Sequence, residues 1–202
     1  GEPSPIYDFK ALYKELSDDY RIVVIEKFGY GFSDEAQGRR SFYTILRQDR
    51  EALEKAGING PFVLCPHSLS GLEAILWAQE YPDEVEAIVG LDMMVANVNV
   101  QAKNKVFNDL VMDINSFAKN VGLLRLIDPD TTGTLTEEER KTVKALYCRD
   151  TANDTVRNER DVENIKEVSI AIYSTPLPTV PTIQYITEED EDDIDNINSA
   201  MD

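Results

Sequence analysis

The sequence feature that most limits the fold is an alternation of short apolar runs with amphipathic helices over the first 96 residues. Runs of strand length at residues 20–26, 61–65 and 85–91 are largely apolar on both faces, which is typical of buried parallel strands. Helical periodicity at residues 41–56 and 69–81 separates them. This order predicts an α/β fold with a mostly parallel sheet and helices on both of its faces.

The pattern changes beyond this region, where helices follow one another with no strand between them. We expect an α/β core at residues 1–96, a helical cap insertion at 97–173, and a return strand with an acidic tail at 174–202. The return strand itself is expected at residues 182–186. Helical spacing predicts four more helices: residues 6–16, 103–121, 136–149 and 155–172.

The charge of the chain argues against nucleic acid as a partner. Its 202 residues include 38 acidic and 20 basic side chains, a formal net charge of -18. Residues 187–202 hold eight acids and no base, and without them the net charge would be -10. A block of like charge is typical of a solvated segment. Because so negative a surface repels phosphate backbones, we expect no nucleic-acid partner.

Neither a membrane span nor a cofactor is expected. No run of about 18 apolar residues occurs, and the N-terminus lacks the basic and then apolar pattern of a signal peptide. Cys65 and Cys148 are too few for a disulfide framework and wrongly spaced for zinc, so we expect both to be buried thiols. The loop around Gly29 and Gly31 lacks the lysine and helix N-terminus of a phosphate-binding loop, and we interpret it as a turn.

The strongest chemical signal is the segment Cys65-Pro-His-Ser-Leu-Ser-Gly71, between an expected strand and an apolar helix. A nucleophilic serine on a tight strand-to-helix turn needs small residues two positions to either side, because the backbones approach closely there. Pro66 and Ser70 occupy these positions, so the usual G-x-S-x-G becomes P-x-S-x-S. A serine in this place is on its own more often an N-cap, but the context favours a nucleophile at Ser68.

Three stretches together resemble the α/β-hydrolase fold family. They are Glu26-Lys-Phe-Gly-Tyr-Gly-Phe-Ser-Asp34, which is similar to that family's D-R-x-G-x-G-x-S loop, the turn at Ser68, and Trp77-Ala-Gln-Glu-Tyr-Pro-Asp-Glu-Val85. The resemblance implies a serine hydrolase that acts on a small carboxylic ester or similar acyl substrate beneath a helical cap. It also implies strands upstream of Gly1 that this chain does not contain.

The same resemblance implies roles for individual residues. Ser68 would be the nucleophile and the backbone N–H of Leu69 one oxyanion-hole donor, with the second donor at or just ahead of Gly1. The family's acid follows a late strand, and its spacing leads to Asp190. Asp92, at the end of the strand after the serine helix, is the alternative acid.

The catalytic base is the difficulty, because His67 is the single histidine in the chain. A triad base reaches the serine oxygen from a separate loop, whereas a sequence neighbour on a sharp turn points away. We therefore expect His67 to be structural, and a serine without a base is a weak nucleophile. Two hypotheses stay open: a hydrolase of which this chain is incomplete at both ends, or a non-catalytic binding or interaction module. In both, open sheet edges would favour self-association.

Residues 128–139 match part of the calcium-loop pattern. Acids stand at positions 1, 3 and 12, and Gly133 stands at position 6. Thr132 at position 5 and Pro129 at position 2 depart from the pattern, and no second loop exists to pair with this one. Thr136 as an N-cap with acids in the first helical turn explains the same residues, and we favour this structural interpretation over a metal site.

Overall fold

The computed structural model describes residues 4–97, 102–130 and 133–186, and it divides into two compact units. The sheet unit comprises Ser41–Val100 and Glu163–Asp202. The helical unit comprises Gly1–Arg40 and Gln101–Val162. The division into core, cap and return strand that the sequence predicts remains a prediction.

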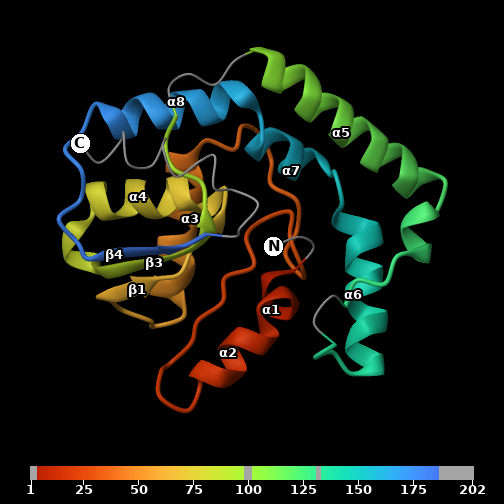
Figure 1. Ribbon diagram of the computed structural model, residues 1–202, viewed down its shortest axis with the longest axis horizontal. Helices are drawn as coiled ribbons and strands as arrows, with labels where there is room; N and C mark the ends of the chain where they lie inside the picture. Colours follow the sequence, from red (N-terminus) through yellow and green to blue (C-terminus); the bar gives the residue numbers. More distant parts are fainter. Residues whose placement is uncertain (1–3, 98–101, 131–132, 187–202) are drawn as a thin grey trace. The chain divides into compact units, whose positions relative to one another are not determined.

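The sheet unit is built on a central strand, β3 (Val85–Met93), with parallel neighbours on both sides (Figure 1). β1 (Phe62–Leu64) and β2 (His67–Ser68) pair with successive parts of one edge of β3, and β4 (Thr182–Tyr185) pairs with the other edge. Ile88, for example, is in register with Leu64 on one side and Thr182 on the other. The parallel sheet and the return strand are thereby confirmed.

Helices pack in layers on this sheet (Figure 1). α3 (Phe42–Lys55) begins at the N-cap Ser41, whose hydroxyl accepts a hydrogen bond from the Thr44 N–H. α4 (Ser70–Glu80) packs against β3 and α3, and a 3₁₀ turn, η1 (Pro82–Glu84), connects it to β3. α8 (Val162–Tyr173) contacts α4 through Gln79, whose amide donates to the Ile172 carbonyl at 3.1 Å. The helices that the sequence predicts at 41–56 and 69–81 are confirmed.

The two faces of the sheet differ in burial. Ile88 lies on the α4 side and is 1% exposed. Val63, Ile183 and Tyr185 lie on the opposite face and are more than half exposed. Within the described part of the sheet unit, the expected second layer of helices is therefore not seen.

The expected strand at residues 20–26 is wrong. This run has no regular secondary structure, and its apolar side chains Tyr20, Ile22 and Val23 are exposed. A parallel strand is stable only when a neighbouring strand satisfies its backbone groups, and none of the described strands pairs with this run. The expectation of two buried thiols is also wrong, because Cys65 follows the edge strand β1 and is exposed, while Cys148 is partly exposed.

The helical unit contains the other helices, and the described residues between 102 and 162 include no strand. The helix expected at 6–16 is interrupted at Phe9, and the one expected at 155–172 is interrupted at Arg160 and Asp161. No helix of the described residues is long and apolar enough to cross a membrane. The elements are α1 (Pro5–Asp8), α2 (Lys10–Leu16), α5 (Ala102–Asn120), η2 (Leu123–Leu126), α6 (Glu137–Asp150) and α7 (Asp154–Glu159).

The glycine-rich loop after residue 26 is a turn, as the sequence predicts. The Glu26 carboxylate accepts hydrogen bonds from the Ser4 hydroxyl and, at 2.9 Å, from the Phe32 N–H. A β-carbon at Gly31, whose φ is +55°, would overlap this carboxylate. The Asn153 side chain donates to the Gly29 carbonyl at 2.8 Å and holds the turn against the start of α7. Glycine is required here by both conformation and space.

An ion pair ties α2 to α6. Lys10, which is buried, donates to the Glu139 carboxylate, and Glu139 also accepts from the Thr136 N–H at 2.7 Å. The Lys10 ammonium and then these cap hydrogen bonds lower the pKa of Glu139 to about 2.

We expect Glu139→Gln to lower the melting temperature at pH 7. A carboxyl whose pKa is lowered by folding stabilises the fold above its unfolded pKa, near 4.5, and loses that contribution as the pH falls toward 2. The difference between wild type and variant should therefore shrink between about pH 5 and pH 2. Thermal unfolding, monitored by circular dichroism at each pH, measures this difference in melting temperature. Glu138→Gln, in the same helical turn, is the control, and an equal effect of both substitutions would contradict the role of Lys10.

Candidate active site

Ser68 lies on the turn between β2 and α4, as the sequence predicts. It is the last residue of β2 and is exposed, and α4 begins two residues later at Ser70. Its φ of +51° is in the left-handed region, which non-glycine residues seldom adopt. The N-cap of α4 is Leu69, without a side-chain cap hydrogen bond, so Ser68 does not serve as an N-cap. The turn presents its hydroxyl rather than using it to close the helix.

Backbone contacts with β3 and its extension hold this turn. The Leu91 N–H donates to the Pro66 carbonyl and the Met94 N–H to the Ser68 carbonyl, both at 2.8 Å. A β-carbon at Gly71 would lie 2.2 Å from the Met94 carbonyl oxygen. The first turn of α4 can therefore approach the end of β3 only because residue 71 has no side chain.

Asp92 lies beside this turn, near the C-terminal end of β3. The parallel register pairs His67 with Leu91 and Ser68 with Met93, so Asp92 stands between the partners of the two turn residues. Its φ of +49° is also left-handed. Ligand sites of open α/β sheets lie at this carboxyl edge. Ser68 and Asp92, two polar residues with left-handed backbones, therefore lie on neighbouring strands at the edge where such a site is expected.

β4 is joined to the same edge. The Gln184 amide donates to the Met93 carbonyl at 3.0 Å, one residue beyond Asp92. This contact fixes the end of β3 from the side opposite β2.

His67 directly precedes Ser68 on the same turn, and its structural role stays a prediction. The pairing with β3 is irregular between His67 and Ser68, and the Ser68 backbone is left-handed, so these two side chains do not follow the regular alternation of a strand. Burial lowers the pKa of His67, and the nearby Asp92 carboxylate opposes that shift. The imidazole is therefore mainly neutral at pH 7.

The remaining residues of the expected site are Leu69, Gly1 and Asp190. Leu69 stands as the N-cap of α4, so its N–H is at the positive end of the helix dipole. Gly1 and Asp190 lie outside the described residues, and their roles stay predictions. Glu73 was missed: it is a buried acid, 4% exposed, in the first turn of α4, five residues after Ser68. Its sequence signal is an acid between the apolar residues Leu72 and Ala74.

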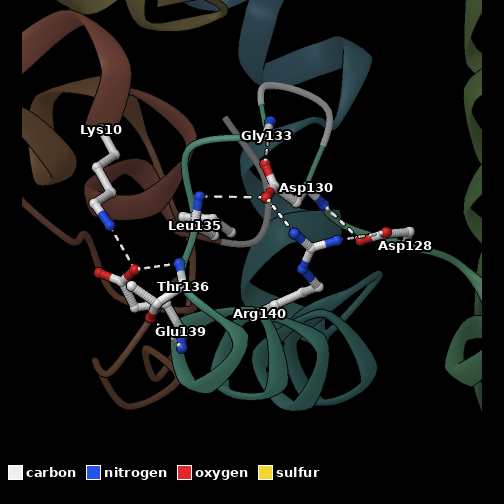
Figure 2. Close-up of polar contacts among 8 residues, drawn as sticks. All are labelled: Lys10, Asp128, Asp130, Gly133, Leu135, Thr136, Glu139 and Arg140. Atoms are coloured by element: carbon white, nitrogen blue, oxygen red, sulfur yellow. Dashed lines mark hydrogen bonds and ion pairs between the residues drawn. The ribbon is translucent and has the colours of Figure 1, made fainter.

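Basic side chains hold the acids of residues 128–139 (Figure 2). Arg140 donates to Asp128 at 3.0 Å and to Asp130 at 3.1 Å. Asp130 also accepts from the backbone N–H groups of Gly133 and Leu135. Glu139 closes a capping box with Thr136, so the capping interpretation is confirmed. Across the ranges that the structure describes, no three potential metal ligands come together.

Comparison with known proteins identifies the family. The family model for the α/β hydrolase fold matches residues 4–168, and the chain belongs to this family. An uncharacterized Bacillus subtilis protein, YbdG, is 33% identical over 166 residues, which cover 79% of this chain and 51% of YbdG. This chain therefore spans about half the length of that relative.

Solved structures agree in fold. The thioesterase domain from the curacin biosynthetic pathway superposes with a TM-score of 0.62 at 15% identity, covering 98% of this chain and 78% of that domain. The haloalkane dehalogenase DatA from Agrobacterium tumefaciens superposes with a TM-score of 0.61 at 14% identity, covering 91% of this chain and 68% of the dehalogenase. At these identities the likeness shows the α/β hydrolase fold alone.

Gly71→Ala should destabilise the protein by about 1–3 kcal/mol, since the added methyl group meets the Met94 backbone carbonyl and must push α4 from β3. Urea unfolding gives the change. Gly90→Ala is the matched control, because its methyl group meets the flexible Met93 side chain instead. Equal destabilisation by both substitutions would contradict a special approach at residue 71.

We expect no tight calcium binding at residues 128–139. A calcium ion would have to displace the Arg140 guanidinium from Asp128 and Asp130, and the Lys10 ammonium from Glu139. Isothermal titration with calcium chloride should show no micromolar site. A micromolar site that Glu139→Gln removes would show this expectation to be wrong.

Proposed function

We propose that this protein is a serine hydrolase of the α/β-hydrolase type, with Ser68 as nucleophile, acting on a carboxylic ester or similar acyl substrate. The observation that carries the proposal is the exposed, left-handed Ser68 at a strand-to-helix turn. A serine at this point of the fold can approach a carbonyl carbon from the sheet edge without obstruction by its own backbone.

The chemistry follows from the turn. Attack by the Ser68 hydroxyl on a carbonyl carbon would generate an oxyanion. The Leu69 N–H, at the start of α4, would donate to it, and one such donor is worth roughly 10² to 10³ in rate. Asp92 is the described acid at the site, and Asp190 is the other candidate.

The base limits the activity of this chain. Ser68 needs a group to take its proton, and we expect that His67, its sequence neighbour on a sharp turn, does not reach the hydroxyl. Loss of triad members lowers rates on the order of 10⁴ to 10⁶. We therefore propose that the 202-residue chain on its own is a poor catalyst.

Relatives support acyl or related hydrolytic chemistry without fixing the substrate. One structural relative is a thioesterase, and another is a haloalkane dehalogenase. A hydroxyl nucleophile at Ser68 suits acyl transfer, and this favours ester or thioester substrates.

The second candidate is a non-catalytic binding module with the same fold. The single histidine of the chain, and its position beside Ser68, favour it. Such a module would keep the sheet edge as a ligand site but would show no serine-dependent turnover.

Slow hydrolysis of p-nitrophenyl acetate is the expected result for the purified chain. Ser68→Ala should reduce the rate to that of buffer, and His67→Ala should change it by less than about threefold, because we expect a neighbour on the same turn not to reach the reacting hydroxyl. Ser174→Ala, at an exposed serine of the same unit, is the control and should have no effect.

Covalent labelling by a fluorophosphonate separates the two candidates. Labelling that Ser68→Ala abolishes supports the hydrolase, whereas neither labelling nor Ser68-dependent turnover supports the module. Robust turnover that His67→Ala abolishes would show that His67 is the base and that the expectation of a structural His67 is wrong.

A further inference from the structure

Gln184 carries a polar side chain on the face of the sheet that α4 covers. It follows Thr182, the partner of Ile88 in register, by two residues, so this half-buried side chain lies on the same face as the buried Ile88. Its amide donates to the Met93 carbonyl at 3.0 Å. Withdrawing an amide from water is unfavourable unless it is hydrogen-bonded, and the partner of Gln184 is the end of β3, beside the candidate site.

The peptide group that accepts this hydrogen bond also donates one. The Met93 carbonyl and the Met94 N–H belong to one planar peptide group, and this N–H donates to the Ser68 carbonyl at 2.8 Å. The Ser68 carbonyl in turn shares a peptide group with the Leu69 N–H. Because the C=O and N–H of a trans peptide point in opposite directions, these groups run head to tail from Gln184 to Leu69.

We propose that Gln184 is a positioning residue for the Leu69 N–H, acting through this relay of two peptide groups. The inference rests on the proposed function, in which the Leu69 N–H donates to the oxyanion. Hydrogen bonds aligned in a chain polarise one another, so the amide at the start of the relay strengthens the donor at its end. Gln184 thereby sets the direction and polarity of that donor, which preorganises it for the charge of the transition state.

The relay crosses three strands at the carboxyl edge of the sheet. It begins on β4, which lies beside β3, passes through the peptide group at the end of β3, and finishes on the turn after β2 (Figure 1). A separate hydrogen bond, from the Leu91 N–H to the Pro66 carbonyl, holds the start of the same turn. Because that bond does not involve Gln184, we expect the turn to persist when Gln184 is replaced. The loss should then affect the rate of reaction at Ser68 more than folding.

The rate of Ser68 labelling by a fluorophosphonate at pH 8 tests the proposal. Gln184→Met keeps the length of the side chain but cannot donate, and Gln184→Glu keeps the shape and is ionised at this pH. We expect both to lower the maximal labelling rate by about tenfold, less than the roughly 10² to 10³ for removing an oxyanion donor itself. The half-saturating probe concentration should change by less than about twofold, because the oxyanion forms only in the transition state.

Gln79→Met is the matched control. The Gln79 amide donates to the carbonyls of Ile172, Thr175 and Pro176 at 3.1–3.2 Å, in the same unit but on the far end of α4 from Ser68. Its replacement removes a glutamine from the packing without touching the relay, so labelling should match that of wild type. Circular dichroism and urea unfolding check that all variants fold.

Amide proton shifts test the relay without any reaction. In nuclear magnetic resonance spectra, Gln184→Met should move the Met94 amide proton upfield, because its hydrogen bond to Ser68 weakens. The Leu91 amide proton, which bonds to the Pro66 carbonyl, is the internal control and should not move.

The possible outcomes separate this inference from the proposed function. Unchanged labelling in Gln184→Met, or an equal loss in Gln79→Met, would overturn the role of Gln184. Absence of Ser68 labelling in the wild type would instead contradict the proposed function. In that case the amide shifts decide whether the relay exists: an upfield shift of Met94 alone supports it, and an unchanged Met94 shift overturns it.

Discussion

The candidate site depends on the close approach of α4 to the end of β3. Two backbone hydrogen bonds, from Leu91 to Pro66 and from Met94 to Ser68, fix the chain on either side of His67. Gly71 lets the first turn of α4 reach the Met94 carbonyl. The left-handed conformation of Ser68 is retained because these contacts leave the turn little other space. If α4 moved away from β3, the two backbone hydrogen bonds and the close approach at Gly71 would be lost together.

Elements set by local interactions could be predicted from the sequence. The hydroxyls of Ser41 and Thr136 cap their helices with bonds to residues three positions away, so their signals lie within one turn. The run at residues 20–26 has the composition of a strand, but a strand also needs a neighbour, and composition does not report whether one is present. The expectation of a buried Cys65 is wrong for the same reason. Its exposure depends on β1 lying at an edge of the described sheet, which composition does not report.

The calcium-like segment shows a second limit of sequence patterns. Spacing identifies the acids of residues 128–139 but not their counter-ions. Arg140 stands one residue beyond the pattern and could have been noticed. Lys10 is 129 positions away from Glu139, and only folding brings the two charges together. A carboxylate pattern therefore predicts a metal site only after the nearby cations have been considered.

The sheet edge at Ser68 and Asp92 carries an argument that does not depend on which function is correct. Each residue adopts a backbone conformation worth of order 1–3 kcal/mol of strain, and they adjoin on neighbouring strands. A left-handed backbone does not by itself indicate a ligand site, because Ala152 in the helical unit adopts one too. Ser68 and Asp92 differ from Ala152 in that both carry polar side chains and lie at the edge where open α/β sheets hold ligands. This coincidence of backbone, polarity and position makes Ser68 and Asp92 the first residues to substitute, whichever of the two functions is correct.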